Sequence, residues 1–174
     1  MKTSEILDRL IAFDTVSHRS NMDMISYIQK LLSDIGADVS LIKNADESKA
    51  NLYATIGPEG RSGVLLSGHT DVVPVEGQNW SVPPFQLTQK NGRYYGRGTA
   101  DMKGFLACAL SAAIKASRKE LITPLHLAFS YDEEIGCIGV RSLIDMLRSA
   151  PIRPLFCIIG EPTGMAVATG HKGK

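Results

Sequence analysis

The sequence has little net charge, and this absence excludes several kinds of partner. Its 174 residues carry a formal net charge of only +1, and 44% of them are hydrophobic. A nearly neutral chain has no general electrostatic attraction to nucleic acid or to an acidic membrane surface. The hydrophobic content is that of an ordinary globular domain with an ample core. We therefore expect no nucleic-acid partner and no membrane partner.

Long apolar runs and paired cysteines are also missing. No segment approaches the roughly 20 apolar residues of a membrane-spanning helix, and the first 14 residues interleave apolar with charged residues, unlike a signal peptide. The cysteines, Cys108, Cys137 and Cys157, lie in apolar segments without paired spacing. We expect them to be buried reduced thiols rather than disulfides or zinc ligands. A soluble chain in the reducing cytoplasm is the corresponding expectation.

Two common catalytic signatures are absent. Gly96 and Gly98 resemble the start of a dinucleotide-binding loop, but Asp101 stands where its third glycine would be, and no Gly-Lys-Ser/Thr motif occurs. Ser67 and Ser130 lack the strand-to-helix elbow that presents a nucleophilic serine. A nucleotide-binding domain and a serine hydrolase are therefore disfavoured.

Hydrophobic periodicity predicts alternating helices and strands. Apolar residues at helical spacing predict helices within residues 1–14, 24–35, 105–114 and 140–147. Short apolar or alternating runs predict strands at residues 39–41, 51–56, 64–66, 85–88, 93–95, 124–131 and 155–159, with a further strand beginning at 167–170. This alternation predicts a layered α/β fold, with helices flanking a largely parallel or mixed central sheet.

Several potential metal ligands follow the predicted strands or precede a predicted helix. They are one histidine and three acidic residues, namely His69, Asp101, Glu134 and Glu161. A carboxylate without compensation would be costly beside an apolar segment, whereas one bound to a cation would not. An imidazole and several carboxylates suit a pair of Zn²⁺ ions that share one carboxylate, for which Asp101 is the expected bridge. Mixed sites of this kind also accept Co²⁺ or Mn²⁺.

The spacing of these residues suggests separate roles. His69 and Asp71 are two residues apart, so they share a face of an extended backbone, where Asp71 can orient the imidazole. A hydrogen-bonded surface pair is the alternative. Glu133 and Glu134 are adjacent and cannot both face one point on a regular strand or helix. One could bind metal while the other moves a proton from water to a leaving amine, although a solvated acidic turn has the same pattern. We expect His126 to be a structural histidine.

Four motifs, taken together and in this order, resemble those of the co-catalytic zinc aminoacylase and carboxypeptidase family. They span residues Gly68–Pro74, Gly96–Gly104, Asp132–Gly136 and Gly160–Thr163. The resemblance implies a zinc-exopeptidase-like catalytic domain. The family includes acetylornithine deacetylases, succinyl-diaminopimelate desuccinylases and glutamate carboxypeptidases, and the detail around Trp80 and Asp101 is most similar to the deacetylases.

The resemblance implies specific metal ligands. His69 and Glu161 would bind one zinc ion, Glu134 would bind the second, and Asp101 would bridge them. It also implies that the Asp101–Met102 peptide bond is cis.

The resemblance further implies a reaction. Asp71 would orient the histidine ligand, Glu133 would be the general base, and the substrate would be a small N-acylated amino acid. In the deacetylases this is N2-acetyl-L-ornithine, hydrolysed to L-ornithine and acetate in arginine biosynthesis. A desuccinylase or related aminoacylase is the nearest alternative, and a non-catalytic metal-binding remnant is the alternative from another class.

The resemblance also suggests that the catalytic domain is incomplete at its C-terminal end. Residues 1–165 would form its amino-terminal part, and residues 166–174 would begin a lid and dimerisation domain whose remainder is absent. A last histidine ligand for the second zinc ion would be missing too. We therefore expect little or no deacetylase activity from this chain alone and uncovered apolar sheet surface. A homodimer is expected for full-length members of the family.

Overall fold

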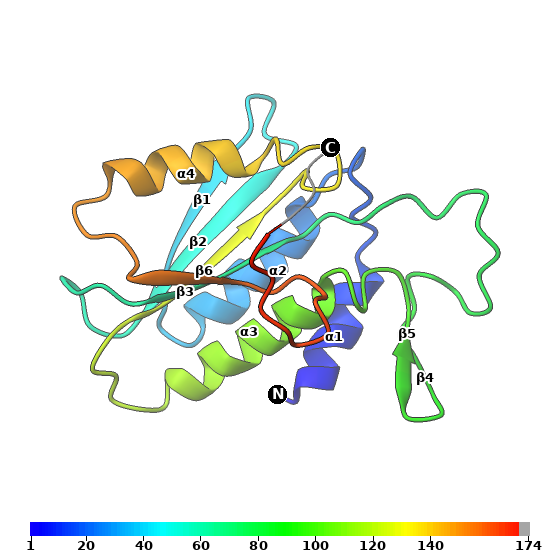
Figure 1. Cartoon of the computed structure of the whole chain (residues 1–174), viewed down its shortest axis with the longest axis horizontal. Helices are drawn as coiled ribbons and strands as arrows, with labels where there is room; N and C mark the ends of the chain where they lie inside the picture. The colour runs from blue at the N-terminus through cyan, green and yellow to red at the C-terminus, as the bar shows by residue number, and fades with distance from the viewer. Residues whose placement is uncertain (171–174) are drawn as a thin grey trace.

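The computed structural model describes residues 1–170 of the chain (Figure 1). The helices in this range are α1 (Thr3–Ala12), α2 (Met22–Ser33), α3 (Lys103–Ala116) and α4 (Val140–Ser149). The strands are β1 (Asp38–Lys43), β2 (Ala50–Ile56), β3 (Val64–His69), β4 (Thr88–Lys90), β5 (Arg93–Tyr95), β6 (Leu125–Ser130) and β7 (Phe156–Ile159). The predicted alternation of helices and strands is confirmed.

A five-stranded mixed sheet forms the centre of the fold. Its strand order is β1-β2-β6-β3-β7. Strands β3, β6 and β7 are parallel, whereas β2 is antiparallel to both of its neighbours. The register places His69 opposite Ser130 and Ser67 opposite Ile159. The chain therefore leaves three neighbouring strands at the same edge of the sheet, where parallel α/β sheets place their sites.

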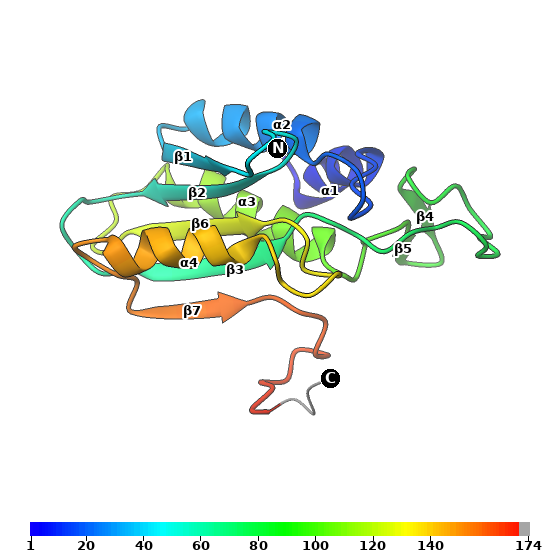
Figure 2. The same cartoon turned by 90° about the horizontal axis from the view of Figure 1, so that it is seen from above.

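Helices cover both faces of the sheet, as the sequence predicts. Helices α1, α2 and α3 lie on one face and α4 lies on the other (Figure 2). Apolar residues at helical spacing are buried in one core with residues of the sheet, including the fully buried Ile6, Leu10 and Leu106. Gly68 allows β3 to lie close to α3, because a Cβ atom there would come within 2.8 Å of the side chains of Leu106 and Met102. The residue before His69 is thus held against the core.

Some local predictions are wrong. The strand predicted at residues 85–88 begins only at Thr88 and pairs with β5 in a separate two-stranded ribbon that projects from the sheet (Figure 1). Residues 167–170, predicted to begin a strand, have no regular structure. Their apolar pattern has no neighbouring strand to pair with in the described residues. The prediction that a lid domain begins at residue 166 extends beyond the described range, because residues 171–174 lie outside it.

The prediction of buried cysteines is also wrong. Cys108, Cys137 and Cys157 are free thiols, as expected, but all three are exposed. Cys108 is on the outer side of α3, Cys137 is in a loop, and Cys157 is on the edge strand β7. Apolar neighbours along the chain indicate a regular element but not which of its faces is covered.

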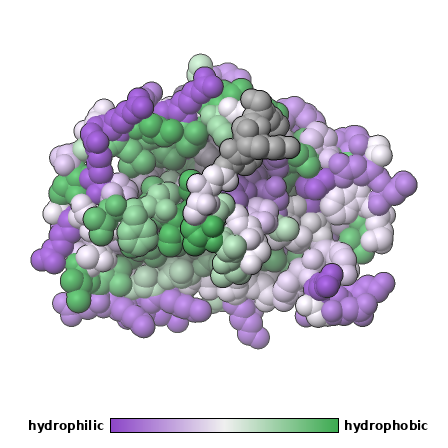
Figure 3. Space-filling model, viewed as in Figure 1, coloured by the Kyte–Doolittle hydropathy of each residue, from purple (hydrophilic) through white to green (hydrophobic). Residues whose placement is uncertain are grey.

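The edge strand β7 leaves an apolar surface uncovered, as expected. All four of its residues are exposed, as is Leu155 before it. This strand faces the viewer in Figure 1, and Figure 3 shows apolar surface on that side of the molecule. Among the described residues, no helix is long and apolar enough to cross a membrane.

Candidate metal centre

Five side chains from one strand end and three loops converge on one edge of the sheet. His69 ends β3 and is only 2% exposed. Its Nε2 atom lies 3.0 Å from Oδ1 of Asp101, 3.7 Å from Oε2 of Glu133 and 3.8 Å from Oε1 of Glu161. A carboxylate oxygen of Glu134 lies within 4.8 Å of ligand atoms of both His69 and Asp101. The structure thus brings together all of the residues that the sequence indicates as metal ligands or as the general base.

The ligand atoms form two overlapping sets. One set contains His69, Glu133 and Glu161, and the other contains His69, Asp101 and Glu134. Within each set, the potential ligand atoms lie within 4.8 Å of one another. The two sets share the buried imidazole of His69.

The charges at this edge are unbalanced. In the described part of the chain, the ion pairs of Asp101, Glu133 and Glu161 are all with His69. Burial lowers the pKa of His69, but the neighbouring carboxylates, led by Asp71, raise it to about 9. One imidazolium cannot offset this many carboxylates.

The pKa values of Glu134 and Glu161 are both raised, by burial and in part by the negative charges of neighbouring carboxylates. Burial, followed by the charge of Asp101, raises the pKa of Glu134. Burial also raises the pKa of Glu161, although His69 acts in the opposite direction. Carboxylates held together in this way are stabilised by a nearby cation. The donor set therefore fits a divalent metal ion.

The imidazole is oriented differently from the prediction. Its Nδ1 atom lies 2.9 Å from the backbone carbonyl oxygen of Asp71, whereas the Asp71 carboxylate is 3.5 Å away. A carbonyl oxygen can only accept a hydrogen bond, so Nδ1 carries a proton, and Nε2 is the ring atom that faces the acidic cluster, 3.0 Å from Oδ1 of Asp101. Asp71 therefore contacts His69 more closely through its backbone than through its side chain.

The Asp71 carboxylate instead holds the acidic turn. Oδ1 accepts the amide N–H of Glu133 at 3.1 Å, and Oδ2 accepts that of Glu134 at 3.2 Å. Burial raises the pKa of Asp71, but interactions with His69 and Ser17, and with these amides, lower it overall. Residues 132 and 133 lie outside any regular element, and Asp132 has a φ of 56°. Because the backbone is irregular, both glutamates can approach His69, which the rule for strands and helices did not anticipate.

The loop that carries Asp101 has its own anchor, which sequence reasoning missed. Lys103 is completely buried, and its Nζ donates a hydrogen bond to the carbonyl oxygen of Phe13 at 2.6 Å. Burial lowers the pKa of Lys103 to about 7. The Asp101–Met102 peptide bond is cis, as the resemblance implies. A lysine at the start of an apolar helix gives no sign in the sequence of the distant carbonyl that it meets.

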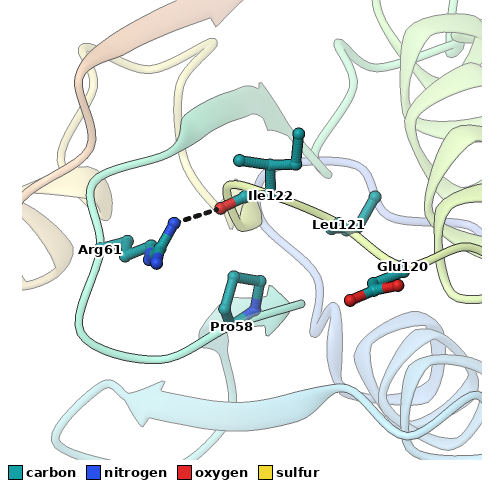
Figure 4. Close-up of a pocket in the computed structure, with 5 residues that line it drawn as sticks. All are labelled: Pro58, Arg61, Glu120, Leu121 and Ile122. Carbon is teal, nitrogen blue, oxygen red and sulfur yellow. Dashed lines mark hydrogen bonds between the residues drawn. The ribbon is translucent and has the colours of Figure 1, made fainter.

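Two concave regions lie away from this centre. One, of about 630 Å³, is lined by Pro58, Arg61, Glu120, Leu121 and Ile122 (Figure 4). The other, of about 600 Å³, shares Pro58 and Arg61 with it and includes His126. Neither contains a candidate ligand.

His126 has the structural role expected of it. Its Nδ1 atom lies 3.0 Å from Oγ1 of Thr55, and its ring stacks on that of Tyr53 with the centroids 5.6 Å apart. His126 is therefore a hydrogen-bonded histidine of the sheet.

Sequence comparison finds relatives of known function. The acetylornithine deacetylase of Vibrio campbellii is 37% identical over 175 residues, which cover 97% of this chain and 45% of that protein. The acetylornithine deacetylase of Pasteurella multocida is 39% identical over 176 residues, with the same coverage. The chain thus spans less than half of the length of these curated relatives.

Solved structures share the fold at lower identity. The M20 family metallo-carboxypeptidase Sso-CP2 from Sulfolobus solfataricus superposes with a TM-score of 0.79 at 24% identity, over 92% of this chain and 37% of that one. Human carnosine dipeptidase 1 superposes with a TM-score of 0.77 at 21% identity, over 90% of this chain and 38% of that one. The layered fold of this chain therefore has counterparts in both of these solved structures.

The pattern that characterises one peptidase family extends over most of this chain. It matches residues 65–172, which include every candidate ligand from His69 to Glu161. On this match, and on the identity with the curated relatives, the chain belongs to the Peptidase family M20/M25/M40.

Proposed function

We propose that this edge of the sheet binds two divalent cations, with zinc as the expected metal and cobalt or manganese as alternatives. His69 and Glu161 would hold one ion, Glu134 would hold the other, and Asp101 would bridge them. The observation that carries this proposal is the pair of overlapping donor sets around one buried imidazole, whose Nε2 atom faces the carboxylates of Asp101, Glu133 and Glu161.

The proposed reaction is hydrolysis of an amide bond. When bound, the cations supply Lewis-acid polarisation of the substrate carbonyl and lower the pKa of a water molecule. Glu133, whose side chain is 38% exposed, takes a proton from the attacking water and delivers it to the amide nitrogen. The C–N bond breaks as a C–O bond forms, so that water is divided between a carboxylate and an amine. Asp71 holds the turn that positions Glu133.

The proposed substrate is an N-acylated amino acid, with N2-acetyl-L-ornithine as the specific candidate. The two relatives at 37% and 39% identity are acetylornithine deacetylases, which supports this choice. The reaction would then release L-ornithine and acetate and would serve arginine biosynthesis in the cytoplasm. N-succinyl-diaminopimelate is the competing substrate.

The organisation of the chain is part of the proposal. Residues 1–165 would be the amino-terminal part of the catalytic domain, with a lid and dimerisation domain starting at residue 166 and a homodimer as the assembly of the whole enzyme. Among the described residues, His69 is the only imidazole in the cluster, since His126 is in the sheet core and His18 is in an exposed turn. We therefore propose that this chain binds metal but turns over slowly by itself.

Titration with Co²⁺ tests the metal centre, because the visible absorption of this ion reports its ligands. We expect the chain to bind cobalt through the cluster, and His69→Ala to weaken binding by more than about tenfold. His126→Ala is the matched control and should retain affinity, because this histidine lies outside both ligand sets. Equal binding by wild type and His69→Ala would reject the proposed centre. Release of acetate from N2-acetyl-L-ornithine, compared with succinate release from the competing substrate, then tests the reaction and its specificity.

A further inference from the structure

Ser17 lies directly beneath the proposed metal centre. It is 4% exposed, and its hydroxyl donates a hydrogen bond to Oδ2 of Asp71 at 2.7 Å. The same carboxylate accepts the amide N–H groups of Glu133 and Glu134. One buried carboxylate therefore joins the loop after α1, the end of β3 and the acidic turn after β6.

The backbone fixes the position of Ser17. Its amide donates to the carbonyl oxygen of Val72 at 3.2 Å, and the amide of Val72 donates to the carbonyl oxygen of Thr15 at 3.1 Å. The carbonyl oxygen of Ser17 accepts a hydrogen bond from Nζ of Lys49, which also forms an ion pair with Asp132 at 2.6 Å. The backbone of Ser17 is thus hydrogen-bonded to the segment that follows β3 and is linked through Lys49 to the acidic turn.

We propose that Ser17 is a positioning residue of the metal centre and acts through Asp71. Oδ2 of Asp71 has two donors, the Ser17 hydroxyl and the amide of Glu134, so removal of the hydroxyl deprives the buried carboxylate of the donor that opposes the acidic turn and leaves it held by the two turn amides. A buried carboxylate that loses a donor no longer holds its other partners in register. Those partners are the amides of Glu133 and Glu134, so the turn that carries both glutamates loosens.

Amide hydrogen exchange, followed by NMR in the metal-free chain, tests the first step. In Ser17→Ala we expect exchange at Glu133 and Glu134 to accelerate roughly tenfold or more, while core amides such as Leu127 keep their rates. Ser17→Thr retains the hydroxyl and should restore protection, and Ser17→Cys, with a weaker donor, should lie between the two. Ser111→Ala is the matched control, because it removes a buried hydroxyl of α3 that accepts a hydrogen bond from Thr3 of α1 and contacts none of the candidate ligands.

Co²⁺ titration of the same variants tests the consequence for the site. We expect Ser17→Ala to bind cobalt about 10–100-fold more weakly than wild type, with an altered visible spectrum, and Ser17→Thr to bind within a few-fold of wild type. This arm rests on the proposed function, and failure of the wild-type chain to bind cobalt would reject that function while the exchange data still decide the role of Ser17. Exchange at Glu133 and Glu134 that is unchanged, or that accelerates equally at core amides, would overturn the positioning role.

Discussion

At the scale of the residue, the buried polar groups are distributed between a reactive edge and a structural interior. His69, Asp71 and Lys103 are each at most 2% exposed, and each has a hydrogen-bond partner. The partners are the carbonyl oxygen of Asp71 for His69, the hydroxyl of Ser17 for Asp71, and the carbonyl oxygen of Phe13 for Lys103. The four remaining acids of the cluster are partly exposed and face one another. Burial and hydrogen bonding therefore fix these three side chains in place, while the four acids remain available to bind cations.

Substitutions of the adjacent residues Glu133 and Glu134 should have different effects on metal binding and on turnover. If Glu134 binds metal and Glu133 moves the proton, Glu134→Gln should lower cobalt affinity at least about tenfold, whereas Glu133→Gln should change it only a few-fold. Isothermal titration calorimetry measures both affinities. Where a preparation shows turnover, Glu133→Gln should reduce it by about 10²–10⁴-fold. The reverse order of affinities would exchange the two roles.

His126 should make the stability depend on pH. In the folded chain, burial lowers the pKa of His126 below the ordinary value of 6.5, so folding favours the neutral ring. This contribution is fully present above pH 6.5 and decreases as the pH falls through the lower pKa of the folded state. We expect wild type to lose more free energy of unfolding than His126→Gln between pH 7 and pH 5, as measured by urea denaturation. Parallel losses in the two proteins would contradict this expectation.

At the scale of the element, close backbone contacts hold the ligand-bearing segments against the core. Helix α3 begins two residues after Asp101, and its first turn packs against the loop that carries this ligand. A Cβ atom on Gly104 would lie 2.3 Å from the carbonyl oxygen of Thr99. The helix can approach the loop only because residue 104 has no side chain.

Gly104→Ala should therefore destabilise the protein despite the better helix propensity of alanine. The steric clash with Thr99 should cost about 1–3 kcal/mol, which exceeds the gain of up to about 1 kcal/mol from propensity. We expect a lower urea midpoint at an unchanged slope. Gly170→Ala, which meets no atom within 4 Å, is the control and should be neutral. A Gly104→Ala protein as stable as wild type would show that the loop yields without cost.

At the scale of the whole molecule, the sheet is covered unevenly. Its interior strands lie between helices, but β7 has β3 as its only neighbour in the described residues, and Phe156 and Ile158 are 52% and 46% exposed. An exposed apolar edge strand is a surface on which chains associate. The protein therefore has a well-packed core and an exposed apolar edge strand, β7, through which chains can associate.

The chain should consequently self-associate through β7 as its concentration rises. Phe156 and Ile158 share a face of the strand, so Phe156→Lys combined with Ile158→Lys should shift sedimentation velocity profiles toward the monomer. Tyr94→Lys is the control, because Tyr94 is 41% exposed but lies on the separate ribbon. Equal association of all three proteins would place the contact elsewhere.

Local patterns in the amino-acid sequence are enough to predict the order of the elements and most residues of the candidate site. Periodicity located the helices and the inner strands, because burial of one face imposes a local pattern. His69, Asp101 and the three glutamates were identified because each follows or precedes an apolar segment, and parallel strands end at one edge.

Only the tertiary structure decided how those residues are held. Ser17 and Asp71 are 54 positions apart, and Lys103 and Phe13 are 90 apart, so no local pattern records these contacts. The convergence of both adjacent glutamates on one imidazole depends on an irregular turn, and the exposure of Cys157 depends on the place of β7 at the edge. Local patterns reflect the burial of a segment, whereas the partners of a buried polar group depend on how distant segments pack.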